Sequence, residues 1–327
     1  MRKTILDLLN GKKVNVQPAF SGLIHITTEG LEREGLAFHE IHKDSQKMAK
    51  AAASTFRSTG MPSATLPLDL CVPAEAIGAE LNYYEGGEFQ FPQVKKALIQ
   101  STKDLSTNLP EILTLGRIAM VCEAITLVKK EVGGEVVISG MIPGPYTLLL
   151  YLCNPKNLFI EMKKEPQAVI NGLFYLSSFL AKISGAYLNA GADFITVHEM
   201  GGSPGFIGPA KFEQFVLPAV KKLNENISAP RVLSVCGNTN TSMHLLVQAG
   251  GDAISVDQTN DLVASRALLK DKLLFGNIDP VQILWQGAPT QVAEAVLRAK
   301  EAGVDAIWPG CDLVPQTSIH NLTALIN

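Results

Sequence analysis

Length, composition and charge narrow the class of protein before any motif is read. The chain has 327 residues, of which 46% are hydrophobic and 18% are charged, so it can bury a large core and has no signature of disorder. Its formal net charge of -3 provides no basic field for nucleic acid or for an acidic membrane surface. We therefore expect neither nucleic acid nor a membrane among its partners.

The first residues and the cysteines indicate a cytoplasmic protein. Residues 1–10 read as an amphipathic helix rather than a signal peptide, because Asp7 interrupts the apolar run. The longest apolar runs, such as 146–153, are too short to span a bilayer. The five cysteines are an odd number without tight spacing, which argues against a disulfide framework.

In chain order, short apolar segments typical of strands alternate with longer segments typical of helices. A helix over 42–58 is predicted to open at Asp44 and to end near Gly60, and residues 83–91 read as an exposed excursion. Further helices are expected at 147–150, 158–163, 167–190, 209–224, 243–249 and 289–302. The predicted strands are 14–19, 64–66, 135–139, 193–197, 232–235, 253–256, 273–275 and 304–307.

This alternation predicts an α/β protein, a (β/α)8 TIM barrel with additional helices in its first sixty or so residues. No internal repeat, low-complexity tract or linker divides the sequence. We therefore expect residues 1–327 to form a single domain.

Polar side chains follow several predicted strands at the point where each strand ends. They are His198, Cys236, Asp257, Asn277 and Cys311. In a barrel the carboxyl ends of the strands meet at one rim, where substrates bind. Two thiols from distant strands could converge there on one soft metal ion, although a lone cysteine is more often a small buried hydrophobe.

At these residues the sequence resembles the uroporphyrinogen decarboxylase superfamily, and within it the zinc-dependent methylcobamide:coenzyme M methyltransferases. The resemblance covers nearly the whole chain. Its clearest segments are 42–50, 68–78, 144–148, 207–209, 276–280 and 302–311.

The resemblance implies a zinc site. In the family, the cysteines of a His-x-Cys motif and of a Pro-Gly-Cys motif are zinc ligands, and they correspond to Cys236 and Cys311. An acid some two dozen residues after the first motif is a further, exchangeable ligand, and Asp257 falls near it. The motif histidine, however, falls on Ser234, and a serine hydroxyl is a poor zinc ligand.

His198 is the candidate replacement, since it ends the preceding predicted strand. Its other interpretation is a rim histidine that is hydrogen-bonded to a loop or to substrate. The neighbouring Glu199 could be a ligand, a catalytic or supporting partner, or a solvated loop acid, and the last is favoured.

The chemistry that the resemblance implies is transfer of a methyl group from a methylated corrinoid to a small acceptor. Zinc held by two thiolates and one further protein group would activate an acceptor thiol such as coenzyme M. Asp257 would complete the site, hold a water or cap its loop. No Asp-x-His-x-x-Gly corrinoid motif occurs in the chain, so the methylcobamide would arrive on a separate corrinoid protein.

Four residues have softer claims to a binding role. Asn238 and Asn277 could bind the acceptor's head group or satisfy loop backbone, the latter being favoured. Glu75 could line the pocket or favour a helix dipole, and Tyr146 could close the cavity or simply pack.

Three alternative functions stay open at this point. A pterin acceptor, tetrahydrofolate, would replace the thiol if the altered motif changes the metal site. A decarboxylase like the superfamily's namesake would need arginines for a polycarboxylate porphyrin, but only Arg2, Arg33, Arg57 and Arg117 precede residue 150. A non-catalytic protein that docks a corrinoid protein would have lost the metal.

Overall fold

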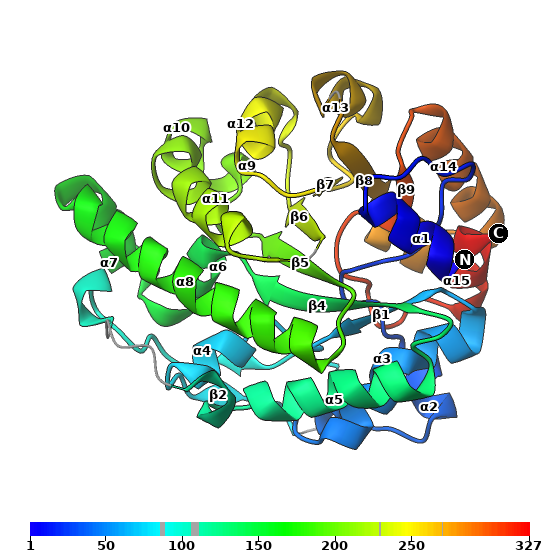
Figure 1. Ribbon diagram of the computed structural model, residues 1–327, viewed down its shortest axis with the longest axis horizontal. Helices are drawn as coiled ribbons and strands as arrows, with labels where there is room; N and C mark the ends of the chain where they lie inside the picture. The colour runs from blue at the N-terminus through cyan, green and yellow to red at the C-terminus, as the bar shows by residue number, and fades with distance from the viewer. Residues whose placement is uncertain (86–88, 106–110, 229, 270) are drawn as a thin grey trace.

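The computed structural model describes residues 1–85, 89–105, 111–228, 230–269 and 271–327. Seven parallel strands form one curled sheet in the order β1-β4-β5-β6-β7-β8-β9, with helices around it (Figure 1). The barrel prediction is confirmed. The strands are β1 Ser63–Leu66, β4 Val137–Pro143, β5 Phe194–Glu199, β6 Arg231–Val235, β7 Ala253–Val256, β8 Leu273–Ile278 and β9 Ala306–Pro309.

The strand expected at 14–19 is absent, and an irregular segment occupies the gap between β9 and β1. Ala19 makes a single bridge to Ile307, flanked by backbone hydrogen bonds from Phe20 N to Ile307 O (3.2 Å) and from Ile307 N to Pro18 O (2.9 Å). On the other side, the contacts to β1 involve side chains, such as Ser21 N donating to Ser63 Oγ at 3.0 Å. The segment thus has no backbone ladder with β1 and only one bridge to β9. The prediction of a strand at 14–19 was therefore wrong.

Helices cover the outside of the sheet. The larger ones are α3 Ser45–Thr59, α5 Ile118–Glu131, α6 Pro145–Leu152, α7 Pro155–Lys164, α8 Pro166–Ala190, α11 Leu217–Glu225, α12 Met243–Gln248, α13 Leu262–Leu269, α14 Pro289–Glu301 and α15 Ile319–Ile326. Further elements are α2 Thr28–Arg33, α4 Val72–Ala76, α9 Pro204–Ile207, α10 Pro209–Lys211 and the hairpin of β2 Leu81–Asn82 with β3 Gln93–Val94. Two π-helical stretches, Phe212–Val216 and Pro280–Trp285, follow β5 and β8.

The helix predicted over 42–58 is confirmed as α3, with the expected signals at both ends. The Asp44 side chain accepts a hydrogen bond from Lys47 N at 2.8 Å, and Gly60 ends the helix in the left-handed conformation, with φ of 82°. The predicted helix over 209–224 is instead divided by the first π-helical stretch. The excursion at 83–91 is only partly exposed: Phe91 packs against Phe38, and residues 86–88 lie outside the described part of the chain.

Helix α1 (Arg2–Leu9) packs onto the amino-terminal end of the barrel. Ile5, Leu8 and Leu9 are buried in one cluster with residues from the beginnings of the strands, including Val137, Phe194, Val232, Ala253, Phe275 and Ala306. Arg2 fixes the helix through hydrogen bonds to Val136 O (2.8 Å) and Asp193 Oδ1 (2.7 Å). Apolar side chains therefore close this end of the barrel. A substrate site is expected at the opposite end, where the carboxyl ends of the strands lie.

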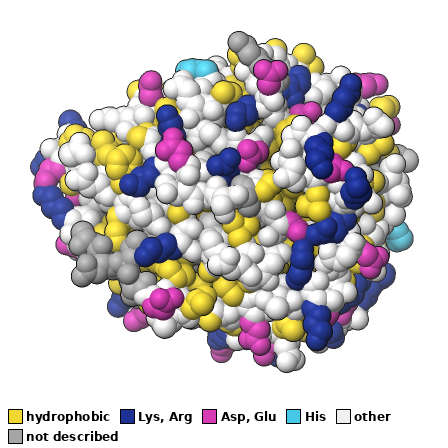
Figure 2. Space-filling view, in the orientation of Figure 1, with side chains coloured by type: hydrophobic (Ala, Val, Ile, Leu, Met, Phe, Trp, Pro, Cys, Tyr) yellow, Lys and Arg dark blue, Asp and Glu magenta, His cyan; other side chains and the backbone are white. Residues whose placement is uncertain are grey.

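Two general expectations can be compared with the structure. All five cysteines are free thiols. Helix α8 is long and apolar enough, by length and composition alone, to cross a membrane, but half of its most apolar window is buried inside the protein, where it packs on α11, α5 and α6. On the face in Figure 2 the acidic and basic side chains are interspersed rather than gathered by sign.

Candidate metal centre and adjoining cavity

Strand alternation brings two of the predicted ligands into the barrel. Phe194 on β5 and Val232 on β6 belong to the inner apolar cluster, and side chains in a strand point to one face at every second position. His198 and Cys236 are each four residues further along. Both therefore face the barrel interior at its carboxyl rim, and both are buried.

Three of the residues predicted at strand ends converge there. His198 Nε2 lies 3.2 Å from Cys236 Sγ, and Cys236 Sγ lies 3.6 Å from Cys311 Sγ. The three ligand atoms all lie within 4.8 Å of one another. The cysteines are 75 positions apart in sequence, so the fold alone makes this cluster.

The spacing and the donor set fit a zinc ion. With Zn–S near 2.3 Å and Zn–N near 2.0 Å, tetrahedral geometry separates two sulfurs by about 3.8 Å and a sulfur from a nitrogen by about 3.5 Å. The observed separations of 3.6 Å and 3.2 Å are slightly shorter. Two thiols and one imidazole are also among the usual zinc ligands.

The electrostatics of the cluster favour a thiolate. The hydrogen bond from the Cys236 thiol holds the pKa of Cys311 well below its usual range, and His198 lowers this pKa further. Burial lowers the pKa of His198, but its interactions with Cys311 and Asp312 outweigh burial, so that the pKa is raised overall. Thiolate and imidazole are also the forms that bind a metal ion, so metal binding here would release protons from the cluster.

Ser234 and His198 occupy equivalent places on neighbouring strands. They are direct partners in the parallel ladder between β5 and β6, and Ser234, two residues before Cys236, also faces the interior. A histidine at 198 is therefore at the same height in the barrel as a histidine at 234 would be.

The remaining rim acid, Asp257, lies beside the cluster but is not part of the group of three. Its Oδ2 accepts from Gly237 N at 3.0 Å and its Oδ1 from Thr259 N at 2.8 Å. Both carboxylate oxygens thus hold loop backbone, including the residue that follows Cys236. This is the loop-capping arrangement among the roles considered for it.

Glu199 is not the solvated acid that we favoured, and that expectation is wrong. Its side chain is fully buried and accepts hydrogen bonds from Tyr146 N, Thr147 N, Thr147 Oγ1 and Gly202 N. These donors lie at the start of α6 and in the loop after β5. Although they partly offset the effect, burial raises the pKa of this carboxyl group. Glu199 therefore links the start of α6 to the loop that follows β5.

The four residues with softer claims all make internal contacts. Asn277 Nδ2 donates to Asp257 O (3.1 Å) and Asn260 O (2.8 Å), and Asn238 Oδ1 accepts from Asn240 N at 3.3 Å. The fully buried Tyr146 donates to Met162 Sδ at 3.3 Å. Glu75 is paired with Arg117. Each of these side chains thus has a partner within the protein, and for Glu75 this partner is an arginine that was not considered.

A cavity of about 460 Å³ opens beside the cluster. It reaches Asp312, the neighbour of Cys311, and Met200, two residues after His198. Apolar side chains dominate its wall, and Lys96 is the one cationic side chain among the described residues that line it. The remaining lining includes Ile24, Leu70, Phe91, Pro92, Val94, Tyr151, Cys153 and Asn154.

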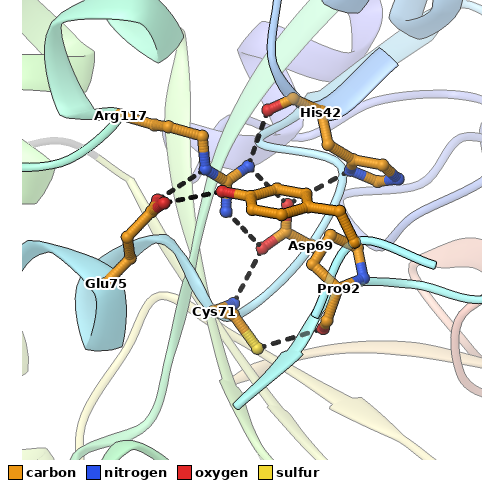
Figure 3. A network of polar contacts seen from close by, with 7 residues as sticks. His42, Asp69, Cys71, Glu75, Pro92 and Arg117 are labelled. Carbon is orange, nitrogen blue, oxygen red and sulfur yellow. Dashed lines mark hydrogen bonds and ion pairs between the residues drawn. The ribbon is translucent and has the colours of Figure 1, made fainter. Parts of the chain in front are cut away.

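A buried ionic network, drawn in Figure 3, adjoins this cavity, whose lining includes Asp69 and Cys71. The Arg117 guanidinium contacts both oxygens of Asp69 at 2.9 and 3.2 Å and Glu75 Oε2 at 2.6 Å. His42 Nδ1 lies 3.2 Å from Asp69 Oδ2, and Asp69 Oδ1 accepts from Cys71 N at 2.9 Å. Burial opposes ionisation of Asp69, but Arg117 and His42 hold its pKa well below the usual range. Burial raises the pKa of the Cys71 thiol to about 12.

The structure also contains features that the sequence patterns did not reveal. The Asp69–Arg117 pair was not anticipated, because its partners are 48 positions apart and neither ends a predicted strand. Asp312 was overlooked too, although its place directly after Cys311 was a usable signal.

The sequence matches the uroporphyrinogen decarboxylase (URO-D) family over residues 1–327. The chain belongs to this family. Its curated relatives include the methylcobamide:CoM methyltransferase MtbA of Methanosarcina acetivorans, with 30% identity over 99% of this chain and 96% of the relative. They also include MtaA, a methylcobamide:CoM methyltransferase of Methanosarcina barkeri, with 28% identity over 100% of this chain and 96% of the relative.

One solved structure and a further curated relative agree with this membership in the URO-D family. A methyltransferase from Methanosarcina mazei superposes with a TM-score of 0.94 at 26% identity, covering 99% of this chain and 96% of the other. A uroporphyrinogen decarboxylase from Geobacter is a more distant relative, with 25% identity over 90% of this chain and 86% of the relative. The recognition made from the sequence motifs is thus confirmed, both for the family and for similarity to its methyltransferase members.

Proposed function

We propose that this URO-D family protein is a corrinoid-dependent methyltransferase that transfers a methyl group from a methylated corrinoid protein to a small thiol, such as coenzyme M. The observation that carries the proposal is the cluster of His198, Cys236 and Cys311. Full-length similarity to methylcobamide:CoM methyltransferases supports the same reaction class.

In this proposal Cys236 and Cys311 are metal ligands rather than nucleophiles, and His198 replaces the histidine that the family motif has at position 234. Zinc bound by these three residues would keep a coordination position for the acceptor sulfur and would lower the pKa of its thiol. The protein's own contribution is to hold two sulfurs and one imidazole at fixed separations on rigid strand ends. Asp257 contributes by fixing Gly237, next to Cys236.

The adjoining cavity suits the acceptor. It borders the cluster through Asp312 and Met200. Within the described part of the chain, Lys96 Nζ and the Tyr151 hydroxyl have no hydrogen-bond or ion-pair partner. An ammonium group and a hydroxyl donor could bind an anionic tail of the acceptor, although the carboxylates of Asp69 and Asp312 also line the cavity. With a single lining cation, the cavity does not supply the counter-charges that a polycarboxylate porphyrin needs, which disfavours the decarboxylase.

The corrinoid would be presented by a partner protein at the carboxyl rim, because the chain has no corrinoid-binding motif of the Asp-x-His-x-x-Gly type. Apolar side chains are exposed in the segments that follow β5, β7 and β8, namely Phe206, Val263, Val281 and Trp285. Exposed aromatic and aliphatic residues beside a site are typical of docking surfaces.

The first test is the metal content of the purified protein, measured by elemental mass spectrometry after expression with added zinc. We expect about one zinc per chain in the wild type, and loss of zinc in Cys236→Ala, Cys311→Ala and His198→Ala, since each removes one of three protein ligands. Cys153→Ala, a buried thiol outside the cluster, is the matched control and should keep its zinc. A wild type without metal would exclude the zinc mechanism and favour a metal-free docking protein.

Methyl transfer then decides the acceptor. The assay follows the absorbance of methylcobalamin in the presence of coenzyme M. We expect this absorbance to disappear with the wild type and to remain with Cys311→Ala. Methyl transfer to tetrahydrofolate, and to none of the thiols tested, would instead support the pterin-directed alternative.

A further inference from the structure

We propose that Asp312 is a positioning residue that orients the imidazole of His198 so that its Nε2 atom is offered to the metal. The inference rests on the proposed zinc function of the cluster. It assigns a task to a carboxylate that is outside the ligand set, and it explains how a histidine on β5 can act in place of one on β6.

The geometry places Asp312 behind the histidine as seen from the sulfurs. Nε2 of His198 faces Cys236 Sγ at 3.2 Å, whereas Nδ1, on the other edge of the ring, lies 3.9 Å from Asp312 Oδ2. Nδ1 is buried and has no hydrogen-bond partner among the described residues. A buried polar atom of this kind calls for a partner, and Asp312 is the acid that faces it.

Asp312 is itself held in place. Its Oδ1 accepts a hydrogen bond from Ile24 N at 2.8 Å, and Ile24 belongs to the irregular segment that closes the barrel between β9 and β1. No donor in the described part of the chain is hydrogen-bonded to Oδ2. One oxygen is thus anchored, and the other is available to His198, about 1 Å beyond ordinary hydrogen-bond length.

The neighbouring acids cannot take this role. Glu199 accepts from Tyr146, Thr147 and Gly202, and both oxygens of Asp257 hold loop amides. Asp312 is therefore the one nearby acid, within the described residues, that combines an anchored oxygen with an unoccupied one.

The chemical reason is tautomer control. A neutral imidazole has one N–H, so an imidazole that binds metal through Nε2 must keep its proton on Nδ1. A carboxylate facing Nδ1 favours that tautomer, fixes the ring orientation and increases the basicity of Nε2. Because Asp312 directly follows Cys311, one loop supplies both a ligand and the support for a second ligand.

The test compares zinc affinity in Asp312→Asn with the wild type, by competition with a chromophoric chelator. If Asn keeps the bond from Ile24 N through its single oxygen, its NH2 group faces Nδ1 and favours the wrong tautomer. We expect zinc binding to weaken by about 10- to 100-fold and the visible spectrum of the Co²⁺-substituted protein to change. Asp279→Asn, at another strand end, is the control and should bind zinc as the wild type does.

Asp312→Glu separates charge from packing, because it keeps the carboxylate. Recovery of a substantial part of the affinity in Asp312→Glu supports the proposal, while affinity equally weak in both variants overturns it. Wild-type affinity in Asp312→Asn also overturns it, but leaves the zinc function of the cluster intact. A wild type that binds no zinc would reject both.

Discussion

At the residue scale, the most informative position is 234, where serine stands in place of the histidine of the family's His-x-Cys motif. His198 and Ser234 are partners in the ladder between β5 and β6, and both side chains face the barrel interior. Moving a histidine sideways by one strand keeps its height relative to the cysteines. The proposed zinc site would therefore tolerate this exchange, whereas a shift by one residue along the strand would turn the side chain outward.

This equivalence predicts a rescue. His198→Ala should lose zinc, and the double variant His198→Ala/Ser234→His should regain about one zinc per chain, because imidazole returns at the same level of the barrel. Elemental mass spectrometry measures both. His198→Ala/Ser234→Asn is the matched control, since an amide is a poor zinc ligand and should restore nothing. Failure of the histidine to restore zinc would mean that position 234 does not reach the metal.

At the element scale, the unusual component is the segment that occupies the eighth place in the barrel. Its single bridge to β9 and its side-chain contacts to β1 allow it to run close to the interior. Gly22 makes this approach possible: a Cβ at this position would lie 2.2 Å from Thr196 Oγ1 and 2.6 Å from the Trp308 ring. The same segment contains Ile24, which anchors Asp312.

Gly22→Ala should therefore affect both stability and the metal centre. Overpacking of a well-packed interior typically costs about 1–3 kcal/mol, and displacement of Ile24 should weaken zinc binding as well. Urea unfolding and chelator competition measure the two effects. Gly134→Ala is the control, because a Cβ there meets nothing within 4 Å. A Gly22→Ala protein with unchanged stability would show that the segment yields easily.

Element prediction was least complete between the first two strands of the sheet. Helix α5 was not anticipated, although its buried residues Ile118, Val121, Ala124, Ile125 and Val128 have the three- and four-residue spacing of an amphipathic helix. That signal was available in the sequence. The failure of the strand at 14–19 is different. Val16 is exposed and Val14 and Ala19 are only partly buried, and the segment makes a single bridge instead of a ladder, which its alternating apolar residues did not indicate.

At the scale of the whole molecule, the Asp69–Arg117 network joins parts that are distant in sequence. Arg117 contacts Asp69, Glu75 and the carbonyl oxygen of His42, and Tyr83 in the β2–β3 region donates to Glu75. Because the folded-state pKa of Asp69 is lowered, this carboxylate contributes stability that is present above its unfolded pKa of about 3.9 and is lost as pH falls through the folded value.

Arg117→Met should remove this contribution. Breaking a buried ion pair by removal of one partner costs about 3–5 kcal/mol. We expect the free energy of unfolding to fall by that amount at pH 7, where Asp69 stays charged without its arginine partner. The difference from the wild type should narrow toward pH 4, because an unpaired buried carboxyl group has a raised pKa and becomes neutral. Urea unfolding at both pH values tests this, with the exposed Arg33→Met as the control. A difference that does not depend on pH would contradict the ionic account.

The sequence by itself determined the seven strands of the parallel sheet and several of the larger helices, the family, and the thiols at two strand ends. These depend on local periodicity, on turn residues and on motifs, all of which lie within short stretches of chain. The three-residue cluster followed from them only through the expected barrel, since parallel strands bring their carboxyl ends to one rim.

Only the tertiary structure decided what each polar rim residue contacts. His198 and Glu199 are adjacent in sequence, yet the first faces the sulfurs and the second is buried against the start of α6. Asp257 and Asn277 proved to hold loop backbone, and Asp312 proved to face the histidine. The physical reason is that side-chain direction and hydrogen-bond partners depend on strand register and loop packing between segments tens of residues apart, which no local pattern records.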